Sequence, residues 1–297
     1  MTTTPEILCV GSVLWDVIGR SAKNMRQGSD VPGRITRLPG GVALNIAMTL
    51  RRFGMHPALL SAVGCDPEGD ELIAACAAMG LITDYVYRSE DRPTDRYMAV
   101  EGANGVIAAI ADAHSLEAAG DKILQAVKTG PLGTSTDPFQ GIIALDGNLT
   151  AALLKEISRD PDFAGVDLRV APASPGKADR LMPFVTEQRG LLYVNREEAG
   201  LMCQTDFADS QAAAAGMLDR GARRVLVTDG SRSACDGALD GLITLDPPCV
   251  SVARVTGAGD TFMAAHIVAE LGGADRTTAL QKALNAAASY VSGGTGL

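Results

Sequence analysis

Residues 254–271 read RVTGAGDTFMAAHIVAEL, and this stretch decides how the rest of the chain is interpreted. Its start is β-branched and extended in character, whereas the part after Asp260 has the composition of a helix, so the glycines stand where a helix begins. There the unpaired backbone N–H groups and the positive end of the helix dipole favour an anion. We therefore predict an anion hole made by Gly257, Ala258 and Gly259.

Asp260 comes directly after this loop. A carboxylate at that place can accept a proton from a hydroxyl nucleophile while the N–H groups hold charge on a transferred phosphoryl group. The stretch alone also fits an aspartate that caps a helix after a flexible turn. Two other phosphate-binding loops do not fit, because G-x-G-x-x-G needs a glycine where Phe262 stands and the sequence has no G-x-x-x-x-G-K-[ST] pattern.

A second glycine pair precedes another helical segment in PGGVALN, residues 39–45. Gly40 and Gly41 would let a sugar ring lie against the backbone, and the Asn45 amide can both donate to and accept from its hydroxyl groups. The alternative is an ordinary glycine turn with a capping asparagine. Asp16, at the end of an apolar run, is a further candidate acceptor for a hydroxyl group, although an acid in this place is more often only solvated.

The segment NREE, residues 195–198, allows two interpretations. Asn195 is a favoured residue at the start of a helix and Glu198 follows three residues later, which is close to a capping box. The functional alternative is a pair of oxygen ligands that holds Mg²⁺ through waters near the phosphates of ATP. Taken alone, the segment favours the cap.

Composition excludes several classes of function. The chain has 297 residues, a formal net charge of −9 and a pI near 4.9, which argues against nucleic acid as a partner because phosphate backbones are bound by clustered Lys and Arg. Six cysteines and three histidines lie at none of the spacings of zinc sites, so we expect free thiols in a reducing cytosol. No apolar run approaches the length of about eighteen residues that a membrane span needs, and we expect a cytoplasmic protein without a membrane partner.

Apolar runs alternate with helical patterns along most of the chain. The predicted strands are 7–13, 57–63, 141–145, 191–194 and 224–228. The predicted helices are 43–53, 69–79, 151–157, 197–203 and 211–220. Strands that alternate with helices of this length indicate a parallel α/β sheet that is covered on both faces.

One region breaks the alternation. Residues 94–112, TDRYMAVEGANGVIAAIAD, contain two strand-like runs around a Gly-Ala-Asn-Gly turn and are therefore predicted to form an antiparallel hairpin. Together with residues from about 16 to 37, the hairpin could form a small separate sheet that covers a site. Its apolar side chains fit either a cover over a nucleobase or a surface between two subunits.

PGGVALN early and TGAGD late, taken together, resemble the ribokinase or PfkB family of carbohydrate kinases, and the likeness runs along nearly the whole chain. The resemblance implies an α/β fold, a ribokinase-like three-layer sandwich with a mostly parallel central sheet and a small β-sheet lid. It also implies ATP and Mg²⁺. On this basis the kinase domain comprises residues 1–15, 38–93 and 113–297, and the lid comprises residues 16–37 and 94–112.

The resemblance assigns roles residue by residue. The family's catalytic base corresponds to Asp260 and its anion hole to Gly257, Ala258 and Gly259. The positions that hold sugar hydroxyl groups correspond to Asp16, Gly40, Gly41 and Asn45. The nucleotide and metal positions correspond to Thr228, Gly230 and Asn285 for ATP, Glu198 for Mg²⁺, and Asn195 for both.

Within the family, residues 29–47 (SDVPGRITRLPGGVALNIA), LLSAVGCDPEGDEL and VTGAGD are most similar to bacterial pseudouridine kinases, which phosphorylate the 5′-hydroxyl group of pseudouridine. A ribokinase-like sugar kinase and another nucleoside kinase remain alternatives. So does a catalytically silent sugar- or nucleoside-binding regulatory protein on the same fold.

The chain departs from the family pattern at two places. Many members have an aspartate at the place of Arg254, and that aspartate helps to bind an activating monovalent cation; the fixed charge of an arginine would replace part of its field and lessen the dependence on K⁺. SRS, residues 231–233, stands where a glycine is common, which affects the expected contacts to ATP. Because exposed lid sheets pair between subunits, the expected assembly is a homodimer through the lid.

Overall fold

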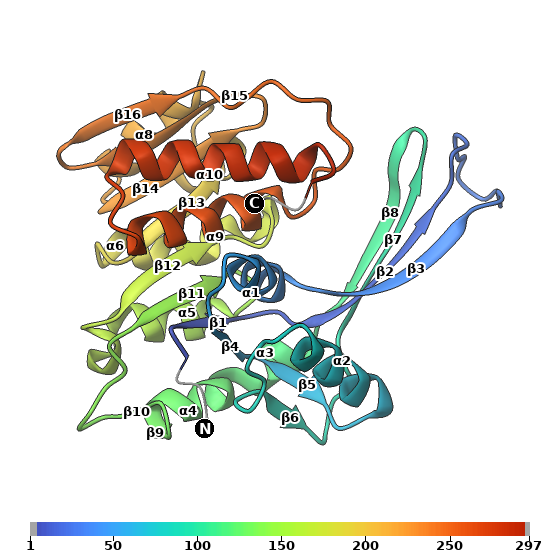
Figure 1. Cartoon of the computed structure of the whole chain (residues 1–297), viewed down its shortest axis with the longest axis horizontal. Helices are drawn as coiled ribbons and strands as arrows, with labels where there is room; N and C mark the ends of the chain where they lie inside the picture. Colours follow the sequence, from blue (N-terminus) through green and yellow to red (C-terminus); the bar gives the residue numbers. More distant parts are fainter. Residues whose placement is uncertain (1–4, 295–297) are drawn as a thin grey trace.

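The computed structural model describes residues 5–294; residues 1–4 and 295–297 of the predicted kinase domain lie outside the described part. Its main sheet has eight strands in the order β16-β15-β14-β13-β12-β11-β1-β4 (Figure 1). The strands from β4 to β14 pair in parallel, and β15 and β16 continue the sheet in antiparallel pairing. The bounds are β1 Ile7–Val10, β4 Pro57–Leu60, β11 Ile142–Asp146, β12 Asp167–Ala171, β13 Leu191–Asn195, β14 Arg224–Asp229, β15 Arg232–Ala238 and β16 Gly241–Leu245.

Helices cover both faces of this sheet, as Figure 1 shows. One face carries α1 Val42–Arg52, α2 Pro67–Ala78, α9 Ala258–Leu271 and α10 Arg276–Val291. The other carries α3 Ser115–Ala119, α4 Gln125–Lys128, α5 Ala151–Arg159, α6 Met182–Thr186, α7 Arg196–Cys203, α8 Ser210–Asp219 and three 3₁₀ turns, η1 Gly120–Leu124, η2 Pro161–Phe163 and η3 Pro175–Leu181. Successive residues of β1 enter the two different cores, because side chains alternate along a strand and both faces of a parallel sheet are buried.

A second, four-stranded sheet stands apart from the main body in the order β3-β2-β7-β8 (Figure 1). Its strands are β2 Leu14–Arg20, β3 Arg34–Gly40, β7 Arg96–Gly102 and β8 Gly105–Asp112. The predicted hairpin is confirmed as the antiparallel pair β7–β8, and β2 joins it in parallel. The β2–β3 ladder runs from the pair Leu14 and Gly40 outward, so this sheet begins two to three residues closer to the main body than the segment 16–37.

The base of the second sheet is fastened to α2. Trp15 donates from its indole Nε1–H to the carbonyl oxygen of Glu68 at 3.0 Å, and the guanidinium of Arg37 lies 4.1 Å from the centre of the Trp15 ring. Arg37 also pairs with Glu71. Two short sheets complete the fold, β5 Ala62–Gly64 with β6 Tyr87–Ser89, and β9 Thr129–Gly130 with β10 Gly133–Thr134.

The predicted helices are all present within a few residues of their expected bounds, but two predicted strands are shorter than expected. The run 7–13 leaves the sheet after Val10, because Gly11 takes a φ of +149°. The run 57–63 divides at Ser61, whose hydroxyl group donates to the carbonyl oxygen of Gly11 at 2.5 Å. Strands β12, β15 and β16 and helix α10 were not predicted.

Candidate active site

Helices α1 and α9 begin side by side near the carboxyl ends of the parallel strands. Asn45 lies in the first turns of α1 and Asp260 in the first turn of α9. The Nδ2–H of Asn45 donates to Oδ2 of Asp260 at 2.9 Å, which joins two motifs that are 215 residues apart in the sequence. Because ligands of open α/β sheets bind at this edge, the contact marks the candidate site.

The start of α9 differs from most other long helices of the described chain. Helices α2, α5, α7, α8 and α10 begin at a residue whose side chain accepts a backbone N–H, whereas α9 begins at Gly257 without a side-chain cap. Gly257 has a φ of +87°, a conformation that favours glycine. A Cβ at Gly259 would meet no heavy atom within 4 Å, so open space lies beside the uncapped turn. An anion can reach the turn here.

Asp260 is partly buried, and burial is the main cause that raises its pKa to about 7. The hydrogen bond from Asn45 lowers this pKa, while the negative charges of Asp146, Asp16 and Glu198 raise it. A carboxylate with a pKa near neutrality can accept a proton at physiological pH and is a better proton acceptor than an ordinary aspartate.

Asp16 meets the glycine pair Gly40 and Gly41 at the base of the second sheet. A Cβ on Gly40 would lie 2.0 Å from Oδ2 of Asp16, so only a glycine leaves room for this carboxylate. Gly41 has a φ of +103°, and a Cβ there would lie 2.4 Å from the carbonyl oxygen of Ser12. Burial raises the pKa of Asp16 to about 6. The glycine pair is therefore required by the packing of the site itself.

Asp146 is a residue of this site that the sequence did not single out. It ends β11 and is fully buried. Its Oδ2 accepts the backbone N–H and the hydroxyl group of Ser12, both at 2.7 Å, and the N–H of Ala43 at 3.1 Å. Its Oδ1 accepts the N–H of Asn148 at 2.7 Å. This carboxylate fixes the start of α1, and with it Asn45, against the ends of β1 and β11.

Asn195 and Glu198 form the capping box that the spacing favoured. Oδ1 of Asn195 accepts the N–H of Glu198, and Oε2 of Glu198 accepts the N–H of Asn195, each at 2.8 Å. Glu198 is buried, and burial raises its pKa to about 7. The structural interpretation as a helix cap is confirmed. The negative charge of Glu198 is also one of the causes that raise the pKa of Asp260.

Two of the remaining predicted nucleotide residues lie further along the same edge of the sheet. Thr228 pairs with Asn195 in the β13–β14 register, and Gly230 follows in the β14–β15 turn with a φ of +62° and open space around it. Asp229, the last residue of β14, pairs with Arg196 at 3.1 Å. Asn285 does not lie at this edge: it is exposed on α10, where it accepts a hydrogen bond from Gln281, and α10 packs on α9.

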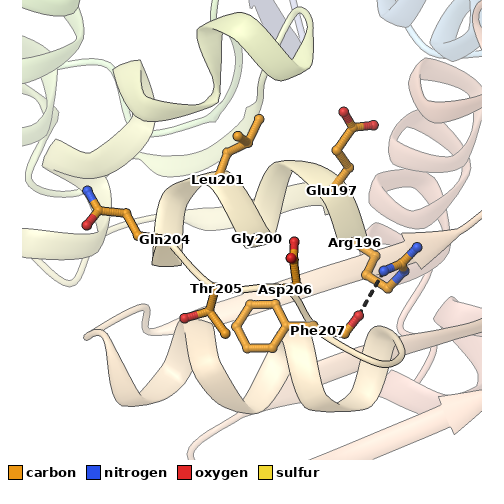
Figure 2. A pocket seen from close by; sticks show the side chains of 8 residues that line it. All are labelled: Arg196, Glu197, Gly200, Leu201, Gln204, Thr205, Asp206 and Phe207. Carbon is orange, nitrogen blue, oxygen red and sulfur yellow. Dashed lines mark hydrogen bonds between the residues drawn. The ribbon is translucent and has the colours of Figure 1, made fainter.

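A surface groove of about 620 Å³ lies elsewhere, between α7 and the segment that leads to α8 (Figure 2). Arg196 crosses one end of it and donates to the carbonyl oxygen of Phe207 at 2.8 Å. None of the predicted site residues lines this groove. The candidate site is therefore the region around Asp260 and not this groove.

Two features are absent from residues 5–294. No group of three or more His, Cys, Asp or Glu side chains in this part of the chain is arranged to enclose a metal ion. Mg²⁺ keeps several of its waters and needs few protein ligands, so this finding does not bear on a magnesium ion held through waters. No helix in the same range is long and apolar enough to cross a membrane.

Comparison with known proteins identifies relatives over most of the length of the chain. Residues 4–295 match the family described as pfkB family carbohydrate kinase. The pseudouridine kinase of Escherichia coli is 28% identical over 87% of this chain and 81% of its own length. The ribokinase of Bacillus subtilis is 25% identical over 95% of this chain and 91% of its own length.

Solved structures confirm the fold. A carbohydrate kinase from Agrobacterium tumefaciens matches 96% of this chain and 90% of its own, with a TM-score of 0.79 and 23% identity. Arabidopsis thaliana ribokinase, solved with ribose and ATP, matches 99% of this chain and 95% of its own, with a TM-score of 0.77 and 22% identity. The fold is thus the expected ribokinase-like α/β sandwich with a mostly parallel central sheet. The chain belongs to the pfkB family of carbohydrate kinases.

Proposed function

We propose that this protein transfers the γ-phosphoryl group of ATP to the 5′-hydroxyl group of a nucleoside, pseudouridine above all. The observation that carries the proposal is the hydrogen bond between Asn45 and Asp260. It brings a polar group suited to a sugar hydroxyl next to a carboxylate at an uncapped helix start. Phosphorylation of an alcohol needs these parts together, namely a place for the hydroxyl group, a base and donors for the phosphoryl oxygens.

The chemistry follows from the positions of these groups. Asp16 and Asn45 hold hydroxyl groups of the sugar, and the Asp260 carboxylate takes the proton of the reacting hydroxyl group as its oxygen bonds to the γ-phosphorus. The bond from that phosphorus to the bridging oxygen breaks, and ADP leaves. The N–H groups of Gly257 and Gly259 would stabilise the negative charge on the transferred group. The N–H of Ala258 donates to the carbonyl oxygen of Val255 at 3.1 Å and would join them by exchanging this partner for a phosphoryl oxygen.

Mg²⁺ would neutralise charge on the ATP phosphates, and Glu198 is the residue best placed to hold it through waters, with Asn195 beside it. Thr228 and Gly230 would contact the nucleotide from the adjoining strand end, where the open space around Gly230 leaves room for it. Asn285 would lie near the adenine.

The preference for a nucleoside rests on the second sheet. Asp16 lies opposite Leu38 in the β2–β3 register and opposite Tyr97 in the β2–β7 register, so the three side chains share one face. An aromatic and an apolar side chain beside a sugar-binding carboxylate fit a nucleobase attached to that sugar. The similarity to the E. coli pseudouridine kinase supports the same substrate. A ribokinase-like sugar kinase is the alternative.

The test is ATP-dependent release of ADP with Mg²⁺ against pseudouridine, uridine, adenosine and ribose in parallel. We expect turnover on pseudouridine well above that on the other three. Turnover confined to ribose would keep the chemistry and replace the substrate. Absence of turnover on all four compounds would favour a binding protein without catalysis. The Asp260→Asn variant, purified in the same way, serves as the control for contaminating kinases.

A further inference from the structure

The segment between β16 and α9, residues 246–257, carries the glycine turn but has almost no support of its own. It contains neither helix nor strand, and residues 248–256 are exposed. Its apolar side chains do not anchor it, since Val252 and Val255 are 63% and 70% exposed. A turn that must hold donors in place for a phosphoryl group therefore needs fixed contacts from another element.

Those contacts come from the carboxyl-terminal end of α10. The backbone N–H groups of Ala253 and Arg254 both donate to the carbonyl oxygen of Val291, at 2.7 and 3.1 Å. The Arg254 guanidinium donates from Nε to the carbonyl oxygen of Tyr290 at 3.0 Å and from a terminal nitrogen to that of Gly294. Carbonyl groups at a helix end lack partners within the helix and favour a cation, so Arg254 satisfies the end of α10 while it holds the segment.

Tyr290 makes the second half of the attachment. Its ring lies under the Arg254 guanidinium at 3.8 Å, and its hydroxyl group donates to the carbonyl oxygen of Thr256 at 3.0 Å. A Cβ on Gly257 would lie 2.6 Å from the same hydroxyl oxygen. The phenol thus contacts the residue at which α9 begins, three residues before Asp260.

We propose that Arg254 and Tyr290 are positioning residues for phosphoryl transfer, because together they clamp residues 253–257 to the end of α10. The clamp fixes the N–H groups of the turn relative to Asp260. Neither residue touches the sugar-binding side, where Asp16 and Asn45 belong to other elements. This inference rests on the proposed function and adds to it the residues that hold the anion hole in position.

The test compares Arg254→Ala and Tyr290→Phe with the native enzyme by steady-state kinetics. For Arg254→Ala we expect kcat to fall by about 10²-fold, the effect of misplacing catalytic groups by about 1 Å. For Tyr290→Phe, which keeps the ring and loses one hydrogen bond, we expect a fall of about tenfold. The KM for the nucleoside should stay within about twofold in both, since the sugar contacts are intact.

Chemical rescue separates positioning from a general loss of structure. Millimolar guanidinium, far below denaturing concentrations, should restore part of the kcat of Arg254→Ala and leave the native enzyme unchanged. Tyr87→Phe is the matched control, because Tyr87 on β6 also lies beside a cation, with Lys122 at 5.3 Å from its ring and 3.3 Å from its hydroxyl group. We expect its kcat to equal that of the native enzyme.

Three results would overturn the inference. The first is folded Arg254→Ala and Tyr290→Phe proteins with native kcat, and the second is a loss of kcat that Tyr87→Phe shares. The third is a loss that guanidinium does not relieve and that follows the melting temperature alone. A native enzyme that phosphorylates no nucleoside or sugar would instead overturn the proposed function, together with the inference that rests on it.

Discussion

Replacing Asp260 with asparagine keeps the shape of the side chain and removes its capacity to accept a proton. We expect a loss of kcat of about 10² or more, the usual weight of general-base catalysis. Folding should be preserved, because the native carboxylate is already disfavoured by burial. Stopped assays of ADP release with purified, folded protein check this, and near-native turnover of the variant would show that Asp260 is not the base.

The raised pKa of Asp260 predicts a specific pH profile. The base acts when ionised, so kcat/KM should rise with pH through about 7. The Asn45 hydrogen bond lowers this pKa, and Asn45→Ala should therefore move the midpoint to higher pH besides weakening substrate binding. Thr49→Ala on the same helix, which loses only a bond to the Asn45 carbonyl, should leave the midpoint in place. A midpoint that is unchanged in Asn45→Ala would contradict this assignment.

Arg254 also bears on cation dependence. Its guanidinium already donates to the carbonyl groups of Tyr290 and Gly294, so these oxygens have a fixed cationic partner. We expect ADP-release rates that agree within about twofold in K⁺, Na⁺ and tetramethylammonium chloride at equal ionic strength. Strong activation by K⁺ alone would show that Arg254 does not replace a monovalent cation.

Local chemistry decided which site residues the sequence could reveal. Gly257, Gly259 and Asp260 were predictable because a helix start with glycines and an acid can be recognised from a few consecutive residues. Asp146 was not, because its partners Ser12 and Ala43 are 134 and 103 residues away. An acid directly after the apolar run IIAL was the only hint that the sequence offered.

Helices and strands also differ in whether local contacts or distant contacts determine them. The predicted helices have local caps and regular apolar spacing, whereas β15, RSACDGA, contains an aspartate and a glycine that local rules place in turns. Asp236 is nevertheless fully buried in this strand, because Arg224 and Arg276 both pair with it. Arg224 is twelve residues away and Arg276 lies on α10, so tertiary pairing outweighs the local preference of the strand.

Helix α9 carries a buried histidine whose titration affects stability. His266 is fully buried, its Nδ1 lies 2.9 Å from the Tyr193 hydroxyl group, and its Nε2 has no partner among the described residues. Burial lowers its pKa to about 4, although Glu270 opposes the shift. Since the unfolded histidine binds a proton below its ordinary pKa of about 6.5, the free energy of unfolding should fall as the pH drops from 6.5 towards 4.

Urea unfolding at a series of pH values measures this contribution. Over that window His266 should lower the free energy of unfolding by up to about 1.4 kcal/mol per pH unit, and His266→Phe should lack this component. His114→Gln, which removes a histidine with a 72% exposed side chain, is the control and should keep the native slope. Equal slopes for His266→Phe and the native protein would contradict the prediction.

At the scale of the whole molecule, the second sheet carries a surface that a single copy does not cover. The β2–β7–β8 register places Val17, Met98 and Ile110 in one row, on the face opposite to Asp16. Ile35 of β3 lies on this outer face and is 77% exposed, and Ile110 is 63% exposed. The strands β3 and β8 are also the open edges of their sheet. Exposed apolar side chains beside open strand edges favour association.

We therefore propose a homodimer through this sheet, which projects from the main body in Figure 1. Light scattering after size-exclusion chromatography should give twice the chain mass for the native protein and the single mass for a variant with both Ile35→Lys and Ile110→Lys. Leu239→Lys, at the 90% exposed Leu239 between β15 and β16, should remain dimeric. A monomeric native protein would show that this dimer does not form. A variant that carries both lysines and is still dimeric would place the interface elsewhere. Because Asp16 belongs to the opposite face of the same sheet, dissociation should also weaken binding of the substrate, since an unsupported sheet holds this carboxylate less firmly over the site.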